Sequence, residues 1–143
     1  MAIYSLNLKS IGRTTHAAGT AGAHLLYIAR DGASPELVAE HMPAEPNAAR
    51  AWMNRAEAGD RKNARVIDKL RIALPRELTP EQRMQLVREF AGELSQGRVA
   101  WFAAIHATGK DAHNPHCHLV IRDRDIESGK RVLRLSDSAR DRS

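Results

Sequence analysis

Three histidines lie close together in the sequence and are the side chains best suited to chemistry. His116 and His118 are two residues apart in the segment HCHLVIR, and side chains two apart in a strand point to the same face. His106 ends an earlier apolar segment, VAWFAAIH, and nine residues rich in turn formers separate the two segments. An antiparallel hairpin would bring the three imidazoles together, and such a group can hold a divalent cation with positions left open for substrate.

Other interpretations of these histidines are weaker. A single histidine is commonly a surface or core residue, and it is the third imidazole that favours a metal site. The histidine-triad nucleotide hydrolases need a further histidine two residues from the pair, where this chain has Asn114 and Val120. Cys117 is expected to point to the opposite face, into packing. His113 is interpreted as an exposed loop residue, and the histidines that show no ligand-like spacing are His16, His24 and His41.

A phosphate held by a cation can be attacked by water or by a side chain. The chain has two tyrosines, and Tyr4 lies in a segment that alternates like a strand. Tyr27 lies in an alanine-rich segment that favours a helix. From the residues alone, packing against a sheet is the favoured role for Tyr27, with attack on phosphorus as the alternative.

Hydrophobic periodicity and turn signals predict the elements around these residues. The predicted strands are 3–8, 65–74, 99–106 and 116–122, and the predicted helices are 17–30, 47–58 and 80–95. Residues 10–16 are predicted to be a loop, and 31–46 to be irregular because they contain three prolines. A turn at 127–130 leads to a candidate short strand at 131–135. No repeat or linker divides the chain, so a single domain is expected.

Two local sequence patterns predict structure more specifically than the others. Thr79, Pro80 and Gln82 have the spacing of a capping box at the start of the third predicted helix. In the strand predicted at 65–74, alternation puts Lys69 and Arg71 on one face. The opposite face is expected to carry Val66, Asp68, Leu70, Ile72 and Leu74.

The composition favours an anionic partner. The net charge is +5, which is typical of domains that bind nucleic acid. No segment approaches the roughly 20 apolar residues that span a bilayer, and the first residues lack the pattern of a signal peptide. The single cysteine, Cys117, rules out an internal disulfide. A cytoplasmic protein that does not enter a membrane is expected.

The string AIHATGKDAHNPHCHLVIRDRD, residues 104–125, resembles the metal motif of the MobA/MobL-type plasmid mobilisation relaxases. These proteins belong to the HUH endonuclease superfamily. Four further segments resemble the family in order and spacing: MAIYSL, HLLYIARDG, HMP and ALPRELTPEQR. The resemblance covers nearly the whole chain.

This resemblance implies an α+β fold, with helices packed on an antiparallel β-sheet. It implies that residues 1–143 are a relaxase nicking domain lacking C-terminal elements of the family. His106, His116 and His118 would hold one divalent ion, with Mg or Mn usual in the family and Zn, Ni or Co also suited to imidazole. Tyr27 would attack a DNA phosphate, giving a 5′-phosphotyrosyl adduct and a free 3′-OH in plasmid mobilisation or conjugative transfer.

Several further residues are expected to support this chemistry. Some family members carry glutamates on the strand that matches 66–74, where this chain has Asp68, Lys69 and Arg71. Asp68 and Asp111 are expected to contact the metal ligands without binding the ion themselves. The expected DNA-phosphate contacts are Arg13, Arg30, Arg122, Arg124, Lys130 and Arg131. Trp52 and Trp101 are candidates for base stacking, although core packing is the favoured role for both. The partners implied are single-stranded DNA at a transfer origin and accessory relaxosome proteins.

Three alternatives stay open on the sequence. The first is a truncated, non-catalytic DNA-binding remnant with the same fold. The second is a replication-initiation nuclease of the same superfamily, which origin preference would identify. The third is an unrelated metal hydrolase that uses water and forms no covalent adduct.

Overall fold

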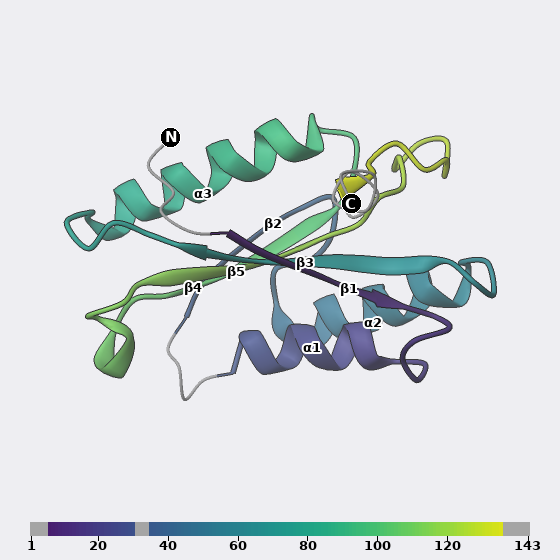
Figure 1. Cartoon of the computed structure of the whole chain (residues 1–143), viewed down its shortest axis with the longest axis horizontal. Coiled ribbons are helices and arrows are strands. Elements are labelled where there is room, and N and C mark those ends of the chain that lie inside the picture. The colour runs from purple at the N-terminus through teal and green to yellow at the C-terminus, as the bar shows by residue number, and fades with distance from the viewer. Residues whose placement is uncertain (1–5, 31–34, 136–143) are drawn as a thin grey trace.

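A five-stranded antiparallel sheet forms the centre of the computed structural model, which describes residues 6–30 and 35–135 (Figure 1). The strands are β1 (Leu6–Gly12), β2 (Glu36–Glu40), β3 (Arg65–Ala73), β4 (Trp101–His106) and β5 (His116–Ile121). Their order across the sheet is β1-β3-β5-β4-β2, and each neighbouring pair is antiparallel. The helices are α1 (Thr20–Ile28), α2 (Pro46–Ala58) and α3 (Pro80–Ser95). The predicted α+β fold is therefore confirmed.

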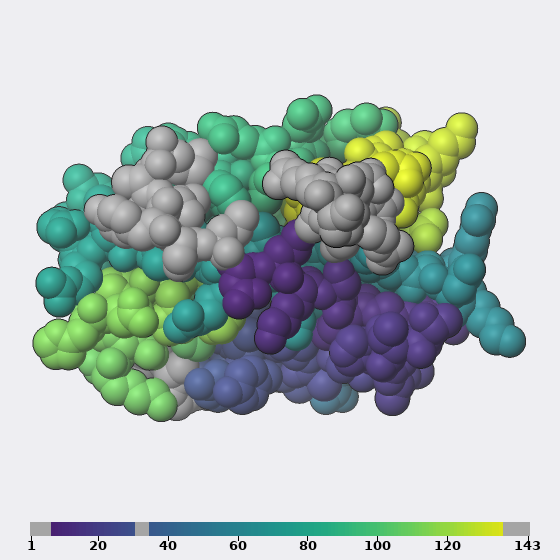
Figure 2. Space-filling model, in the orientation of Figure 1, coloured from purple at the N-terminus to yellow at the C-terminus, as the bar shows by residue number. Residues whose placement is uncertain are grey.

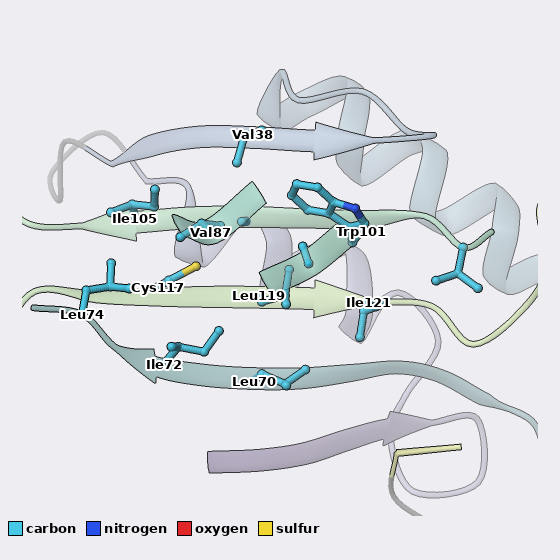
Figure 3. Close-up of a cluster of buried hydrophobic side chains, with 13 residues drawn as sticks. Val38, Leu70, Ile72, Leu74, Val87, Trp101, Ile105, Cys117, Leu119 and Ile121 are labelled. Carbon is cyan, nitrogen blue, oxygen red and sulfur yellow. The ribbon is translucent and has the colours of Figure 1, made fainter. Parts of the chain in front are cut away.

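Two apolar cores separate the helices from the sheet, one on each face. On the first face, Val87 and Ala91 of α3 pack on the sheet with Cys117 and Trp101, and Figure 3 shows this cluster. On the second face, Leu25 of α1 and Met53 of α2 pack against the sheet. Because strand side chains alternate, Cys117 in the first core implies that its neighbours on β5 face the second. This is the orientation predicted for Cys117.

Local signals predicted α3 and the hairpin well. Thr79 Oγ1 accepts from the Gln82 backbone N–H at 3.2 Å, and the Gln82 side chain accepts from the Thr79 N–H at 2.9 Å, so the capping box is present. The hairpin of β4 and β5 pairs in the predicted antiparallel sense, with His106 directly opposite His116. Helix α1 is shorter at both ends than the predicted 17–30.

The first strand and the segment after α1 differ from the prediction. Strand β1 runs over 6–12, so it includes part of the predicted loop at 10–16, because that segment pairs with β3 over its whole length. Residues 1–5 of the predicted strand, with Tyr4, lie outside the described part. Residues 36–40 form edge strand β2 on β4, although 31–46 were predicted to be irregular. The prolines lie outside this five-residue strand, where they interrupt no ladder hydrogen bond.

Alternation on β3 also breaks at one point. Leu70, Ile72 and Leu74 lie in the core under α3 as predicted, whereas Val66 lies in the other core with Ile67. The register of β1 against β3 shifts beside Gly12, where a bulge leaves one residue of β3 unpaired. A bulge of this kind turns the side chains that follow it. Val66 therefore faces the opposite side to the one that strict alternation predicts.

The C-terminal part packs without forming a full strand. The predicted strand at 131–135 is reduced to one isolated bridge, between Arg124 and Arg131. Val132, Leu133 and Leu135 are half-buried against the core under α3. In the described ranges, no helix has the length and apolarity needed to cross a membrane.

Candidate metal centre

The hairpin of β4 and β5 brings the three predicted imidazoles together on the face that α1 and α2 cover. His106 stands directly opposite His116, and His118 follows two residues later on the same side of β5. The ring centroids lie 5.2 Å apart for His106 and His116, and 5.0 Å apart for each of the other two pairs. One nitrogen from each ring lies within 4.8 Å of the other two. The predicted convergence is therefore confirmed, and the separation suits three ligands of one ion.

Backbone hydrogen bonds fix which nitrogen two of these rings offer. His106 Nε2 is 2.7 Å from the Ile28 carbonyl oxygen, and His116 Nδ1 is 3.0 Å from the Asn114 carbonyl oxygen. A carbonyl only accepts, so both ring nitrogens must donate, and the other nitrogen of each neutral ring keeps its lone pair. Metal-bound histidines usually make such a bond through the second nitrogen, which orients the ring. The donor set therefore fits a metal ion.

The electrostatic environment keeps two of the rings neutral. Burial lowers the pKa of His118 from 6.5 to about 3, and the neighbouring imidazoles and Arg71 act in the same direction. Burial also lowers the pKa of His116, although the bond to Asn114 opposes this shift. Only a neutral imidazole can bind a metal. Near neutral pH these two side chains are thus in the form that a cation requires.

The two predicted supporting carboxylates fall in different places. Asp111 lies in the β4–β5 loop, with its Oδ2 3.9 Å from His106 Nδ1, so it is beside the imidazole cluster. Asp68 is opposite Ile121, three positions along the ladder from the residue opposite His118, which is about 10 Å at roughly 3.3 Å per residue. Asp68 is also buried and accepts a hydrogen bond from Ser10 Oγ at 2.9 Å. Asp68 thus has a partner of its own away from the imidazoles, and its supporting role at the metal ligands stays a prediction.

Tyr27 lies on the last turn of α1, immediately before the residue that His106 binds. Its side chain is 60% exposed, so it does not pack on the sheet, which was the role favoured from the residues alone. The guanidinium carbon of Arg30 lies 4.2 Å from the ring centroid, and Arg30 Nη1 donates to the Tyr27 carbonyl at 2.8 Å. The phenol is accessible at the end of α1 that contacts the imidazole cluster.

Sequence reasoning missed His24, which lies one turn before Tyr27 on α1. His24 and His118 line the same cleft, together with Lys69 and Arg71 of β3. Burial lowers the pKa of His24 from 6.5 to about 4, and Lys69 adds to the effect. The only sequence signal was the spacing of three between His24 and Tyr27, which puts the two side chains on one side of a helix.

Three of the predicted DNA-contact arginines are held in a buried ion-pair network. Arg122 is 7% exposed and donates to both Asp60 carboxylate oxygens, at 2.8 and 2.9 Å. Arg124 lies near Asp60 and Asp123, and Arg131 Nε is 3.0 Å from Asp123. Burial raises the pKa of Asp123, while the arginines around it oppose that shift. Charge that is paired in this way is less available to a DNA strand.

The other predicted contacts are more accessible. Arg30 lies beside Tyr27 as described, Lys130 is exposed, and Arg13 contacts the Asp60 carbonyl oxygen. Trp101 is fully buried and Trp52 is half-buried against the core under α1 and α2. Both tryptophans therefore have the packing role favoured from the sequence, and DNA contact by the basic side chains stays a prediction.

The fold and the imidazole cluster together define an α+β domain whose sheet carries a candidate metal centre. The chain belongs to the MobA/MobL family, whose sequence pattern matches residues 21–140. It is 35% identical over 142 residues to the "43 kDa relaxation protein" of Salmonella typhimurium, covering 87% of this chain and 35% of that protein. It is 36% identical over 132 residues to "Mobilization protein A" of Escherichia coli, covering 87% of this chain and 18% of that protein. The chain thus spans about a third or less of these relatives.

A solved structure supports the fold. A chain of the structure described as "Molecular Basis of Vancomycin Resistance Transfer in Staphylococcus aureus" superposes with a TM-score of 0.59. The two are 23% identical, and the match covers 89% of this chain and 73% of the other. At this level of identity the likeness concerns the fold alone.

Proposed function

We propose that this chain is the nicking domain of a plasmid-mobilisation relaxase. Tyr27 attacks one phosphate of single-stranded DNA at a transfer origin, and His106, His116 and His118 would hold a divalent cation that supplies positive charge at the site. The product is a 5′-phosphotyrosyl adduct and a free 3′-OH. Membership of the MobA/MobL family, with relatives named for relaxation and mobilisation, supports this activity over that of an unrelated hydrolase.

The observation that carries the proposal is the bond between His106 and Ile28. It joins His106 Nε2 to the Ile28 carbonyl oxygen over 2.7 Å, and so connects the imidazole cluster to the last turn of α1. Tyr27 is the residue before Ile28. The exposure of the Tyr27 ring leaves its oxygen accessible to a polymer substrate. This buried hydrogen bond holds the helix end that carries Tyr27 against the imidazole cluster. Attack is favoured when the nucleophile and the bound phosphate are held in one reactive geometry.

The residues supply three separate functions. A divalent cation bound by the three imidazoles would neutralise charge that builds on the phosphate oxygens. The guanidinium of Arg30, 4.2 Å from the Tyr27 ring centroid, adds positive charge beside the phenol as its proton is removed. Asp111 Oδ2 lies 3.9 Å from His106 Nδ1, the ring nitrogen left free for a cation, so its negative charge would favour a cation at this site.

The reaction balances without a co-reactant. The bond from Tyr27 Oη to phosphorus forms as the bond from phosphorus to the 3′ oxygen breaks. The phenolic proton passes to solvent, and the leaving 3′ oxygen takes a proton. Because one phosphodiester is replaced by another, attack by the 3′-OH rejoins the strand without ATP.

The test is formation of a covalent adduct between the protein and a labelled single-stranded origin oligonucleotide. Wild-type protein should give a retarded band on a denaturing gel with divalent metal and none with chelator. Tyr27→Phe should abolish the band, whereas Tyr4→Phe, the matched control because the chain has two tyrosines, should retain it. Each of His106→Ala, His116→Ala and His118→Ala should lower the yield at least about a hundredfold, through loss of charge stabilisation.

Other outcomes would support other functions. Cleavage without an adduct, unchanged in Tyr27→Phe, would indicate a hydrolase that uses water. Tight DNA binding with neither cleavage nor adduct would indicate a non-catalytic remnant. Adduct formation on replication origins but not on transfer origins would indicate an initiation nuclease.

A further inference from the structure

A cleft with a basic lining lies beside the imidazole cluster, and its lysine and arginine side chains have no part in the chemistry described above. Its volume is about 180 Å³. The residues that line this basic cleft are Asn7, Lys9, His24, Lys69, Leu70, Arg71, His118 and Leu119. His118 belongs both to the cleft and to the cluster of candidate metal ligands. The cleft therefore adjoins the position of the phosphate that would be cleaved.

The strand register explains why the basic side chains gather there. Lys9 of β1 is directly opposite Lys69 of β3, and Arg71 is directly opposite His118 of β5. Lys69 and Arg71 are two apart, so they share the face that carries the imidazoles. Strand β1 is at the edge of the sheet, and Figure 2 shows its colour (purple) at the molecular surface. A substrate can thus reach these side chains from solvent.

The positive charge in the basic cleft is not neutralised by the described part of the chain. The lining includes no carboxylate, and no ion pair joins Lys9, Lys69 or Arg71 to a described acidic residue. Like charges directly opposite on neighbouring strands are destabilising. By contrast, the arginines of the Asp60 network are closely paired. An anion bound in the cleft would relieve this repulsion.

We propose that the basic cleft binds a second phosphodiester of the DNA strand, next to the one that is cleaved. This inference rests on the proposed function. Lysine offers a compact charge and arginine a planar fork of donors, both suited to phosphate oxygens. Because Arg71 and Lys69 are on a sheet strand, they would hold the DNA at a fixed distance from the imidazole cluster.

The experiment measures the salt dependence of DNA binding. Fluorescence anisotropy of a labelled single-stranded oligonucleotide is followed from 50 to 300 mM salt (roughly the range where single-strand binding is measurable) with chelator present, so that no cleavage occurs. The slope of log K against log salt decreases in magnitude by about 0.7 for each phosphate that the protein no longer neutralises. The double variant Lys69→Gln/Arg71→Gln should lower the slope by about 0.7, the value for one phosphate, and weaken binding roughly tenfold.

Three matched variants make the result specific. Arg88→Gln removes an exposed charge from α3, on the other face of the sheet, and should leave the slope unchanged. Arg71→Gln alone changes an exposed side chain and gives the test if the double variant does not fold. Arg71→Lys keeps the positive charge that Arg71→Gln removes, so its slope should be close to that of the wild type.

The outcomes separate this inference from the proposed function. A double variant with the wild-type slope and affinity overturns the inference, whether or not the wild type forms an adduct. A lower slope in the double variant supports it even if no adduct forms, in which case only the nicking proposal fails. If the two proteins bind DNA equally but 10 mM inorganic phosphate (about ten thousand times a micromolar Kd) raises the melting temperature of the wild type alone, the cleft binds free phosphate and not the DNA strand, and the inference is overturned.

Discussion

His106 Nε2 donates a hydrogen bond to the main-chain carbonyl oxygen of Ile28 over 2.7 Å, and both groups are buried. Ile28 is the last residue of α1, where carbonyls have no partner within the helix. The bond therefore satisfies a helix end and orients a candidate metal ligand at the same time. The position of Tyr27 relative to the cluster depends on it.

Removal of this bond should loosen the end of α1. In His106→Ala, metal-free protein should lose about 1–2 kcal/mol of local stability, the cost of a buried acceptor left without its donor. Hydrogen exchange at the amide of Ala29, which bonds to Leu25, should become faster by roughly five- to thirtyfold. His118→Ala removes another imidazole of the cluster but not the bond, and should leave this amide protected. Equal exchange in both variants would contradict the structural role of His106.

Close packing of α1 on α2 should be sensitive at Gly22. A Cβ there would lie 2.6 Å from Asn54 Oδ1 and 3.2 Å from the Arg50 carbonyl oxygen, so the helices must separate. Gly22→Ala should lower the free energy of unfolding by about 1–3 kcal/mol and reduce adduct formation. Gly92→Ala on α3 is the control, since a Cβ there meets nothing within 4 Å, and it should raise stability by about 0.5–1 kcal/mol. Urea unfolding of both variants gives the comparison.

Acidification should destabilise the metal-free protein. The pKa values of His118 and His24 are lowered to about 3 and 4 in the folded state, whereas both are near 6.5 in the unfolded state. Between these values the unfolded state binds more protons, so stability falls as the pH is lowered from about 7 to 4. The melting temperature should therefore decrease over this range. His24→Asn should reduce the slope, and His113→Asn, in the exposed loop, should not.

The Asp60–Arg122 pair should matter for stability and not for DNA binding. Both side chains are buried and doubly hydrogen-bonded, so Arg122→Gln leaves the buried Asp60 charge with only Arg124 of the described residues beside it, at 3.5 Å, which should cost up to about 3–5 kcal/mol. Asp60→Leu/Arg122→Met removes both charges and should cost less. A salt slope of DNA binding that is lower in this double variant, in protein that is still folded, would instead favour the predicted contact with phosphate.

The identity of the ligands predicts an order of metal affinities. Three imidazoles favour Mn, Co, Ni and Zn over Mg, with affinity rising across the series as far as copper. A metal at a hundred times its Kd should stabilise the fold by about 2.7 kcal/mol, and His116→Ala should abolish this gain. Calorimetric titration of the apo protein with each ion tests the order. Binding of Mg as tight as that of Ni would argue for oxygen ligands outside the cluster.

The candidate metal centre was predictable because its geometry is local. The His-x-His pair, the preceding turn and the period of two along a strand were enough to bring His106 to His116. Strand β2 was not predictable, because five residues between prolines give little signal without the β4 neighbour. The distance of Asp68 from the imidazoles was not predictable for a related reason. Alternation placed it correctly relative to Lys69, but only the pairing with β5 shows how far along the ladder it lies.

The basic cleft depends on contacts that local sequence patterns do not encode. Lys9 and Lys69 are sixty positions apart, and only the register of β1 on β3 puts them directly opposite. His24 had no ligand-like spacing and joins the cleft through the packing of α1. Such long-range juxtapositions follow from strand order, which has no signature in any single segment.

The register of β4 and β5 has a consequence for where this hairpin can tolerate insertions. His106 and His116 face each other through ladder pairing, and their connection passes through the exposed residues Ala112 and His113. Extra residues inserted between these two would lengthen the loop without shifting the paired strands. The hairpin tip (light green in Figure 1) is thus a place where the chain can lengthen while the three imidazoles keep their relative positions.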